Sequence, residues 1–188
     1  MVRTLLSLLF VSVFCTLPSF AQTMPGGFVK QSTVSTQGIG PDGEVMNSRE
    51  GKATLMLDPS SGELRVIFDL STFMIRYPGI DSLLENESDP LMVFSGNIGM
   101  NIFKLNEVRD DNRVYTINGD LAHQGKTYQV TALFDPISFS GAFDAANEMK
   151  VNFKMQVDTK LFYVAGFSDG GFSALTFEVA PGLVNIPH

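Results

Sequence analysis

Tryptophan is absent from this sequence of 188 residues, which has one cysteine and two histidines. The lone Cys15 excludes an internal disulfide and any cysteine-rich metal site. His123 and His188 lie far apart, so a zinc site built on paired histidines is disfavoured. No H-E-x-x-H motif or metal-spaced cluster is present either. These absences predict a protein that is not an enzyme and holds no metal or cofactor.

Positive charge is also scarce, because 13 lysines and arginines face 20 acidic residues and give a net charge of −7. An acidic protein repels phosphate backbones, so nucleic acid is disfavoured as a partner. No basic amphipathic stretch suggests a helix that lies on a membrane surface. We therefore expect neither nucleic-acid binding nor stable membrane insertion.

The first 21 residues have the layout of a secretory signal peptide. Arg3 supplies a positive charge, an apolar run covers residues 5–13, and Ser19-Phe20-Ala21 ends in a small-x-small pattern. The run is shorter than the roughly 20 apolar residues that a spanning helix needs. We predict cleavage after Ala21, a single mature domain over residues 22–188, and a periplasmic or secreted location. A membrane anchor and lipidation at Cys15 are the weaker alternatives.

Alternation of apolar and polar residues marks two stretches, residues 63–70, where Ile67 is the one apolar residue on the polar face, and residues 148–158. Successive side chains of a strand point to opposite faces, so alternation predicts one dry face and one wet face. The dry faces consist of Leu64, Val66, Phe68 and Leu70 in the first stretch, and of Met149, Val151, Phe153, Met155 and Val157 in the second.

Weaker alternation predicts further strands, and short turn sequences separate many of them. The predicted strands cover residues 28–36, 53–58, 91–98, 102–108, 114–121, 126–135, 137–143 and 172–179. The predicted turns lie at residues 58–62, 110–112, 123–125 and 145–147.

Many strands in sequence, joined by short connections, favour an antiparallel meander. Closing such a sheet removes its edges and buries its apolar face. We therefore predict an all-β protein, an antiparallel closed barrel of about eight strands, with a two-sheet sandwich as the alternative. An outer-membrane barrel is disfavoured because the two clearest strands carry charged residues on their polar faces. The long connection over residues 71–90 predicts a short helical excursion near 78–88 that covers one end.

Residues 115–130 contain a recognisable signature. The stretch resembles the G-x-L-x-x-H-G-x-T-K-x-V region of the YceI-like family of secreted bacterial proteins, with matches at Gly119, Leu121, Gly125, Thr127 and Val130. Gln124 occupies the family's histidine position, His123 falls one residue early, and Tyr128 replaces the lysine. The chain therefore resembles a divergent member. The resemblance implies a lipocalin-like barrel that carries a polyisoprenoid or similar amphiphile in its lumen.

The apolar inventory of 16 phenylalanines and 9 methionines suits a flexible apolar ligand. With the resemblance, it favours a non-catalytic binding protein whose partner is a lipid or isoprenoid small molecule. A structural or adhesion domain with a filled core is the alternative, and homodimer formation is left open. The candidate ligand-binding residues are the dry strand faces and two tyrosines: Leu64, Val66, Phe68, Tyr115, Tyr128, Val130, Phe134, Met149, Val151, Phe153 and Met155. Tyr115, Tyr128 and also Tyr163 could anchor a polar group at a cavity mouth.

His123 falls in a predicted turn, and no serine–acid pair is placed beside it by the sequence. We expect its ring to hydrogen-bond the backbone of the hairpin. A general-base role would require a deep pocket that brings a carboxylate to this histidine.

Overall fold

The structure is a computed structural model that describes residues 28–58, 60–74, 84, 88–99, 114–140, 148–164 and 166–185. Within these ranges, only the backbone is described for residues 28–30, 49–50, 136–140, 148–150 and 180–185. The predicted signal peptide, the predicted strand over 102–108, and the predicted turns at 110–112 and 145–147 lie outside the described residues. Most of the predicted helical excursion over 78–88 also lies outside them. Only Leu84, which is helical, and Ser88 of that stretch are described.

Eight strands and one short 3₁₀ helix make up the regular structure of the described residues. They are β1 (Phe28–Ile39), β2 (Val45–Leu57), β3 (Glu63–Asp69), η1 (Leu70–Thr72), β4 (Leu91–Asn97), β5 (Tyr115–His123), β6 (Lys126–Ser140), β7 (Glu148–Asp158) and β8 (Ala174–Asn185).

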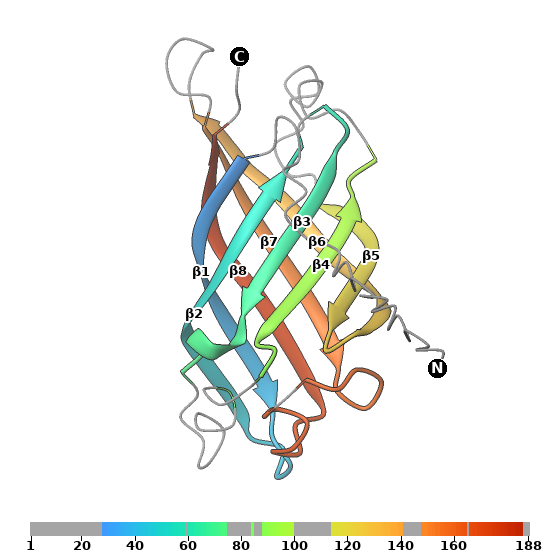
Figure 1. Cartoon of the computed structure of the whole chain (residues 1–188). Coiled ribbons are helices and arrows are strands. Elements are labelled where there is room, and N and C mark those ends of the chain that lie inside the picture. The colour runs from blue at the N-terminus through green and yellow to red at the C-terminus, as the bar shows by residue number, and fades with distance from the viewer. Residues whose placement is uncertain are drawn as a thin grey trace, which may run out of the picture.

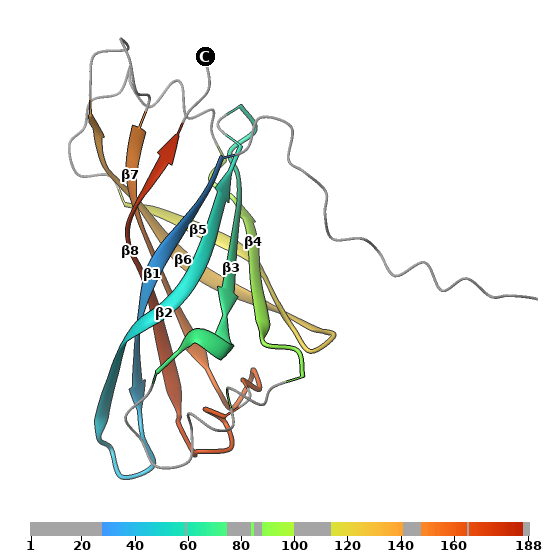
Figure 2. The ribbon, with the colours of Figure 1, turned by 60° about the vertical axis from the view of Figure 1, so that its left-hand side comes forward.

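The strands form a closed barrel in sequence order, which confirms the predicted architecture and rules out the sandwich. Each strand pairs antiparallel with its neighbour, and β1 closes the barrel on β8 with Val34 opposite Val179. The strands tilt strongly around the barrel axis (Figures 1 and 2). In this orientation the lower end carries the β1–β2 turn and the β7–β8 connection, and the upper end carries the β2–β3 turn.

Bulges explain the main differences between the predicted strands and the observed ones, including the missed residues 180–185 of β8, where the register with β7 shifts between Val151 and Phe153. β2 has one extra residue at positions 49–50, because these two residues lie opposite the single Ser35 of β1, between the pairs Val34–Gly51 and Thr36–Ser48. The register also shifts between Pro136 and Ser138 in β6. An extra residue reverses the phase of the alternation. The first half of β2 was therefore missed, and the predicted strands over 126–135 and 137–143 proved to be one strand.

The predicted dry faces point into the barrel. The buried apolar side chains of the strands, from Val34 in β1 to Val179 in β8, are at most 2% exposed. The predicted turn at 123–125 is a tight hairpin in which Gln124 and Gly125 have positive φ angles of 49° and 69°. Positive φ at both central residues matches the twist of the flanking strands.

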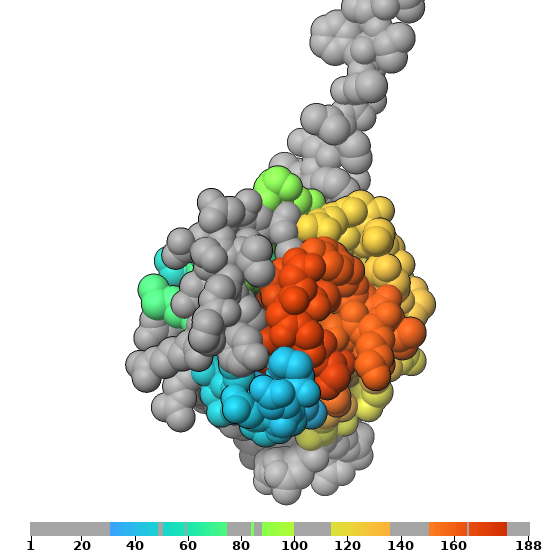
Figure 3. All heavy atoms as spheres, turned by 90° about the horizontal axis from the view of Figure 1, so that it is seen from below, coloured from blue at the N-terminus to red at the C-terminus, as the bar shows by residue number. Residues whose placement is uncertain are grey.

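The lower end is closed by chain segments rather than left open. We name the connection between β7 and β8, residues 159–164 and 166–173, the plug. Seen from below (Figure 3), the plug atoms, in red, fill the centre of this end beside the β1–β2 turn in blue. Phe73, which follows η1, and Leu84 are also buried in the core. The predicted cover from residues 71–90 is therefore present in part, and the plug adds to it.

Candidate functional site: the lumen and its lower end

Aromatic rings meet across the middle of the lumen. We name Phe68, Phe94, Phe153 and Phe177 the central phenylalanine cluster. The ring centroids of Phe68 and Phe153 are 6.2 Å apart, those of Phe68 and Phe177 5.2 Å, and those of Phe94 and Phe153 5.1 Å. Because β3 and β7 are on opposite walls of the barrel, these contacts span the lumen. Tilted ring pairs at such distances are favourable beyond the area they bury.

Two inward-facing glycines leave room for one ring of this cluster. Gly96 in β4 pairs with Gly119 in β5, and the ring of Phe94 lies against both. A Cβ added at Gly119 would be 2.7 Å from the Phe94 ring and 2.4 Å from the backbone oxygen of Ser95. Only glycine leaves room for the ring at this wall.

The plug continues the aromatic contacts downward. Phe167 contacts Phe177 of the central cluster with centroids 6.4 Å apart, and Phe172 contacts Phe167 at 5.9 Å. On the other side of the lumen, Phe162 packs edge-on against Tyr128 at 4.7 Å. The plug therefore docks on strands from both sides of the barrel.

Hydrogen bonds hold the plug in shape. The Thr159 hydroxyl donates to the backbone oxygen of Phe172, which ties the two ends of the plug together. The backbone N–H of Ser173 donates to the oxygen of Ile39 at 3.0 Å, which fastens the plug to the end of β1. The Tyr163 hydroxyl donates to a carboxylate oxygen of Asp169 at 2.7 Å.

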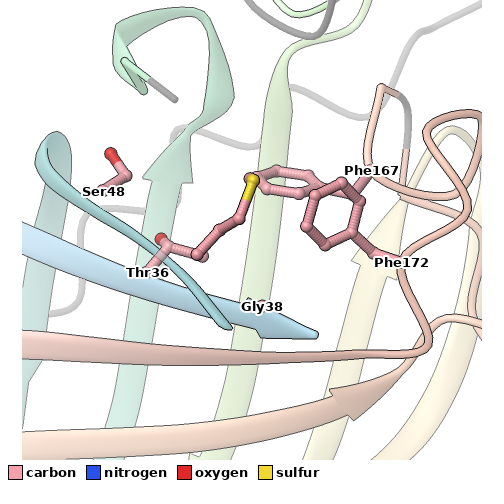
Figure 4. A pocket seen from close by; sticks show the side chains of 6 residues that line it. Thr36, Gly38, Ser48, Phe167 and Phe172 are labelled. Carbon is pink, nitrogen blue, oxygen red and sulfur yellow. The ribbon is translucent and has the colours of Figure 1, made fainter. Parts of the chain in front are cut away.

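A small hollow lies between the plug and the β1–β2 wall (Figure 4). The hollow has no room for a water-sized group as it stands, and its roughly 160 Å³ of empty space includes space open to solvent. We name it the lower hollow; it is lined by Thr36, Gly38, Met46, Ser48, Phe167 and Phe172. Thr36 and Ser48 are each 3% exposed, and their hydroxyls find no hydrogen-bond partner among the described residues.

His123 is the last residue of β5 and is 3% exposed. Its Nδ1 lies 3.1 Å from the backbone oxygen of Leu91, at the start of β4. The bond assigns the proton to Nδ1, because a carbonyl oxygen can only accept. Nε2 is buried without a partner among the described residues. The expected bond to the hairpin backbone is thus replaced by one to the neighbouring strand.

Ten of the eleven predicted ligand-binding residues lie in the core or against it, and for the eleventh, Met149, no side chain is described. Leu64, Val66, Phe68, Phe134, Val151, Phe153 and Met155 are buried in the core, and Tyr115, Tyr128 and Val130 are half-buried against it. For Met149 only the backbone is described, in register with Phe139 and Val184.

The two tyrosines do not share one mouth of the barrel. Tyr115 begins β5 at the upper end, opposite Phe134. Tyr128 lies near the β5–β6 turn at the lower end, under Phe162.

The sequence prediction included none of the residues that surround the lower hollow. The sequence feature that could have indicated the plug is the connection between two clear strands. This connection holds Phe162, Val164, Phe167 and Phe172 and is longer than a hairpin needs.

Residues 166–170 spell Gly-Phe-Ser-Asp-Gly, which matches the G-x-S-x-G pattern of serine hydrolases. In that fold the serine stands on a strand-to-helix turn, whereas here it lies in a turn between two antiparallel strands. The Ser168 hydroxyl accepts a hydrogen bond from the backbone N–H of Val164 at 2.9 Å. The Asp169 carboxylate bonds Tyr163, as described above. Both side chains therefore shape the plug.

Within the described part of the chain, no group of three or more histidine, cysteine or acidic residues could hold a metal ion. The same residues contain no helix long and apolar enough to cross a membrane.

No family model matches the sequence, and no curated protein matches it. A solved structure does match: a polyisoprenoid binding domain from Saccharophagus degradans implicated in plant cell wall breakdown. The chain has the fold of a polyisoprenoid-binding domain. The match has a TM-score of 0.60 and 9% sequence identity, and covers 86% of this chain and 99% of that domain. The fold agrees with the lipocalin-like barrel that the YceI-like resemblance implied.

Proposed function

We propose that the protein is a non-catalytic binding protein that holds a long apolar ligand, a polyisoprenoid or related lipid, inside its barrel. The observation that carries the proposal is a closed barrel with a mostly apolar lining, in a fold shared with a polyisoprenoid-binding domain. Pockets for such ligands are mostly apolar, with few polar groups. The signal-peptide pattern of the first 21 residues supports a location in the periplasm or outside the cell.

The ligand shares the lumen with the central phenylalanine cluster. Its chain lies along the inward faces of β3, β5, β6 and β7, and the rings turn aside to admit it. Phenylalanine has only two side-chain torsions, so such a turn changes the lumen without moving the strands. Met92 and Met155, both buried in the core, add unbranched side chains that adapt to a flexible ligand.

A structural domain with a filled core is the second candidate. The observation that favours it is the set of ring contacts that already bridge β3 and β7 across the lumen. The two candidates differ in one respect that can be measured, because only the first binds lipid.

Native purification followed by solvent extraction and mass spectrometry separates the two. The binding proposal predicts an isoprenoid or acyl species in stoichiometric amount. A protein that yields no lipid, and that also fails to bind hydrophobic fluorescent probes, would be the structural domain.

A pair of variants on β6 links the ligand to the lumen. Ala132 is fully buried on the inward face, whereas its neighbour Thr131 is exposed on the outer face. Ala132→Leu adds bulk inside the lumen and should lower the amount of bound lipid, while Thr131→Leu places the same side chain on the outer face and should not. Circular dichroism of both variants checks that the barrel still folds. Equal retention of lipid by the two variants would place the ligand outside the lumen.

A further inference from the structure

The wall of the lower hollow carries two hydroxyl groups side by side. Thr36 of β1 and Ser48 of β2 are register partners, so their Cβ atoms are neighbours across the strand pair. Both side chains face inward and are 3% exposed. Neither hydroxyl has a hydrogen-bond partner among the described residues, although directly opposed hydroxyls often bond each other.

An unpaired buried hydroxyl lowers stability, because it gives up its hydrogen bonds to water. The same two strands carry Val34, Ala53 and Leu55 at other inward positions, which are apolar and fully packed. The Thr36 and Ser48 hydroxyls therefore interrupt a mostly apolar wall, in which the Oγ of Ser32, at another inward position of β1, is also buried without a partner among the described residues. A bound molecule would recover the lost hydrogen bonds of Thr36 and Ser48.

The cover of this pair comes from a separate segment of the chain. Figure 4 shows Phe167 and Phe172 of the plug on one side of the lower hollow, with Thr36 and Ser48 on β1 and β2. Phe172 rests on Gly38, where an added Cβ would be 2.7 Å from its ring. A shift of these two rings enlarges the hollow without breaking a strand pair.

The chemistry of the hollow is uncharged. Thr36, Ser48, His123 and Thr159 are the buried polar residues among those described, and none carries a permanent charge. A carboxylate or phosphate moved into such surroundings needs a cationic partner to offset its loss of hydration. An alcohol or carbonyl oxygen needs only the hydrogen bonds that Thr36 and Ser48 can supply.

We propose that the lower hollow is the subsite for the uncharged, oxygen-bearing end of an amphiphile, which Thr36 and Ser48 hold by hydrogen bonds. This inference rests on the proposed function and specifies which end of the ligand lies where. Thr36 is the register partner of Phe177, a member of the central phenylalanine cluster. When the oxygen of the ligand binds at Thr36, the apolar tail of the ligand therefore begins beside Phe177 and runs up the lumen.

The test compares three probes with the same tail length: a long-chain isoprenoid alcohol, the corresponding hydrocarbon and the corresponding carboxylate. Each is titrated into delipidated protein, into the double variant Thr36→Val/Ser48→Ala, and into the control Thr33→Val. Thr33 is exposed on β1, so its replacement tests the same change of side chain outside the lumen. Thr36→Val keeps the shape of the side chain and removes only the hydroxyl.

The wild-type protein should bind the alcohol more tightly than the hydrocarbon or the carboxylate. The double variant should lose about tenfold in affinity for the alcohol, which corresponds to two ordinary hydrogen bonds, and should keep its affinity for the hydrocarbon. Thr33→Val should match the wild type with every probe.

An unchanged affinity of the double variant for the alcohol overturns the subsite and leaves the proposed function standing. Equal losses for alcohol and hydrocarbon overturn it in the same way, because they show a packing effect. Failure of all three probes to bind the wild type overturns the proposed function and the subsite together. Melting curves of the variants without probe confirm that each is folded.

Discussion

In the middle of the barrel the phenylalanines at 68, 94, 153 and 177 pack ring against ring, whereas the lower hollow leaves two hydroxyls buried without partners. All four rings of the middle belong to strands. The lower end is completed by the plug, whose rings rest on β1 and on the central cluster. Closely packed rings and unpaired buried hydroxyls therefore occupy neighbouring levels of one lumen.

The difference indicates where the molecule can change shape. Strand pairs surround the central phenylalanine cluster on every side, so a large opening there would break the barrel. The plug is joined to the strands at its two ends and by aromatic contacts. Segments with few strand contacts open at lower free-energy cost than the core. We therefore expect the rings in the middle to rotate in place and the rings of the plug to be displaced at the lower end.

The largest effect should come from removing a ring in the middle. Phe153 is fully buried and contacts both Phe68 and Phe94. Phe153→Ala should lower the free energy of unfolding by about 3–5 kcal/mol, since it leaves a cavity among packed rings. Denaturant unfolding measures the loss, with Lys154→Ala as the control. Lys154 is exposed and pairs weakly with Glu178 at 3.8 Å, so its loss should be small. A loss below about 1 kcal/mol for Phe153→Ala would mean that the middle is loosely filled.

A smaller loss of stability should follow from disturbing the contact between the plug and β1. Gly38→Ala places a Cβ 2.7 Å from the Phe172 ring and should cost about 1–3 kcal/mol, as overpacking does. Gly40→Ala is the matched control, because its Cβ would be 3.6 Å from its nearest neighbour, an ordinary contact. Hydrogen exchange should become faster in the plug for Gly38→Ala only. Equal exchange in both variants would contradict the docking of the plug on β1.

Two buried threonines should respond with opposite signs. Thr36 has no hydrogen-bond partner among the described residues, whereas the Thr159 hydroxyl donates to the backbone oxygen of Phe172. Thr36→Val should keep or raise the free energy of unfolding, while Thr159→Val should lower it by about 1 kcal/mol. Urea unfolding of both variants gives the comparison. Equal losses would show that the Thr36 hydroxyl is already hydrogen-bonded in the ligand-free protein.

The smallest effect concerns the upper rim, far from both regions. Hydrogen bonds from the Ser60 hydroxyl and then from the Ser60 backbone N–H lower the pKa of Asp58. Since the folded-state pKa lies below the unfolded one, the carboxylate stabilises the fold above the unfolded value, about 3.9. This contribution is lost as the pH falls through the folded-state pKa.

Asp58→Asn should therefore lower stability slightly at neutral pH and make no difference in acid. Unfolding curves at both pH values measure this, and an equal loss at both would show that charge plays no part. Lipid retention should stay unchanged, because the β2–β3 turn touches neither the central cluster nor the plug.

The parts of the fold that the sequence predicted are those with unbroken alternation. β7 was predicted with its observed bounds because Met149 to Val157 keep one phase throughout. The bulges at residues 49–50 and at Pro136 reversed the phase of the apolar–polar alternation. Half of β2 was therefore not predicted, and β6 was predicted as two strands. The sequence also allowed the prediction that Tyr115 and Tyr128 lie at opposite ends of the barrel, because Tyr128 is much closer to the predicted turn at 123–125.

The candidate site was predictable only in its apolar part. Inward residues such as Val66 and Phe153 follow the strand period, and a period can be found in a single sequence. The plug has no period, because Phe162 and Phe172 are buried by contacts with strands that are distant in sequence. Thr36 and Ser48 carry no motif, and their pairing depends on the register of β1 and β2.

Unfolding of the delipidated protein with increasing amounts of a long-chain isoprenoid alcohol tests the central claim most directly. A ligand that binds only the folded barrel raises its stability by an amount that grows with concentration, about 2.7 kcal/mol at a hundredfold excess over Kd. The account predicts such a rise in the wild type and a weaker one in Ala132→Leu. A denaturation midpoint that stays fixed at every concentration would contradict it.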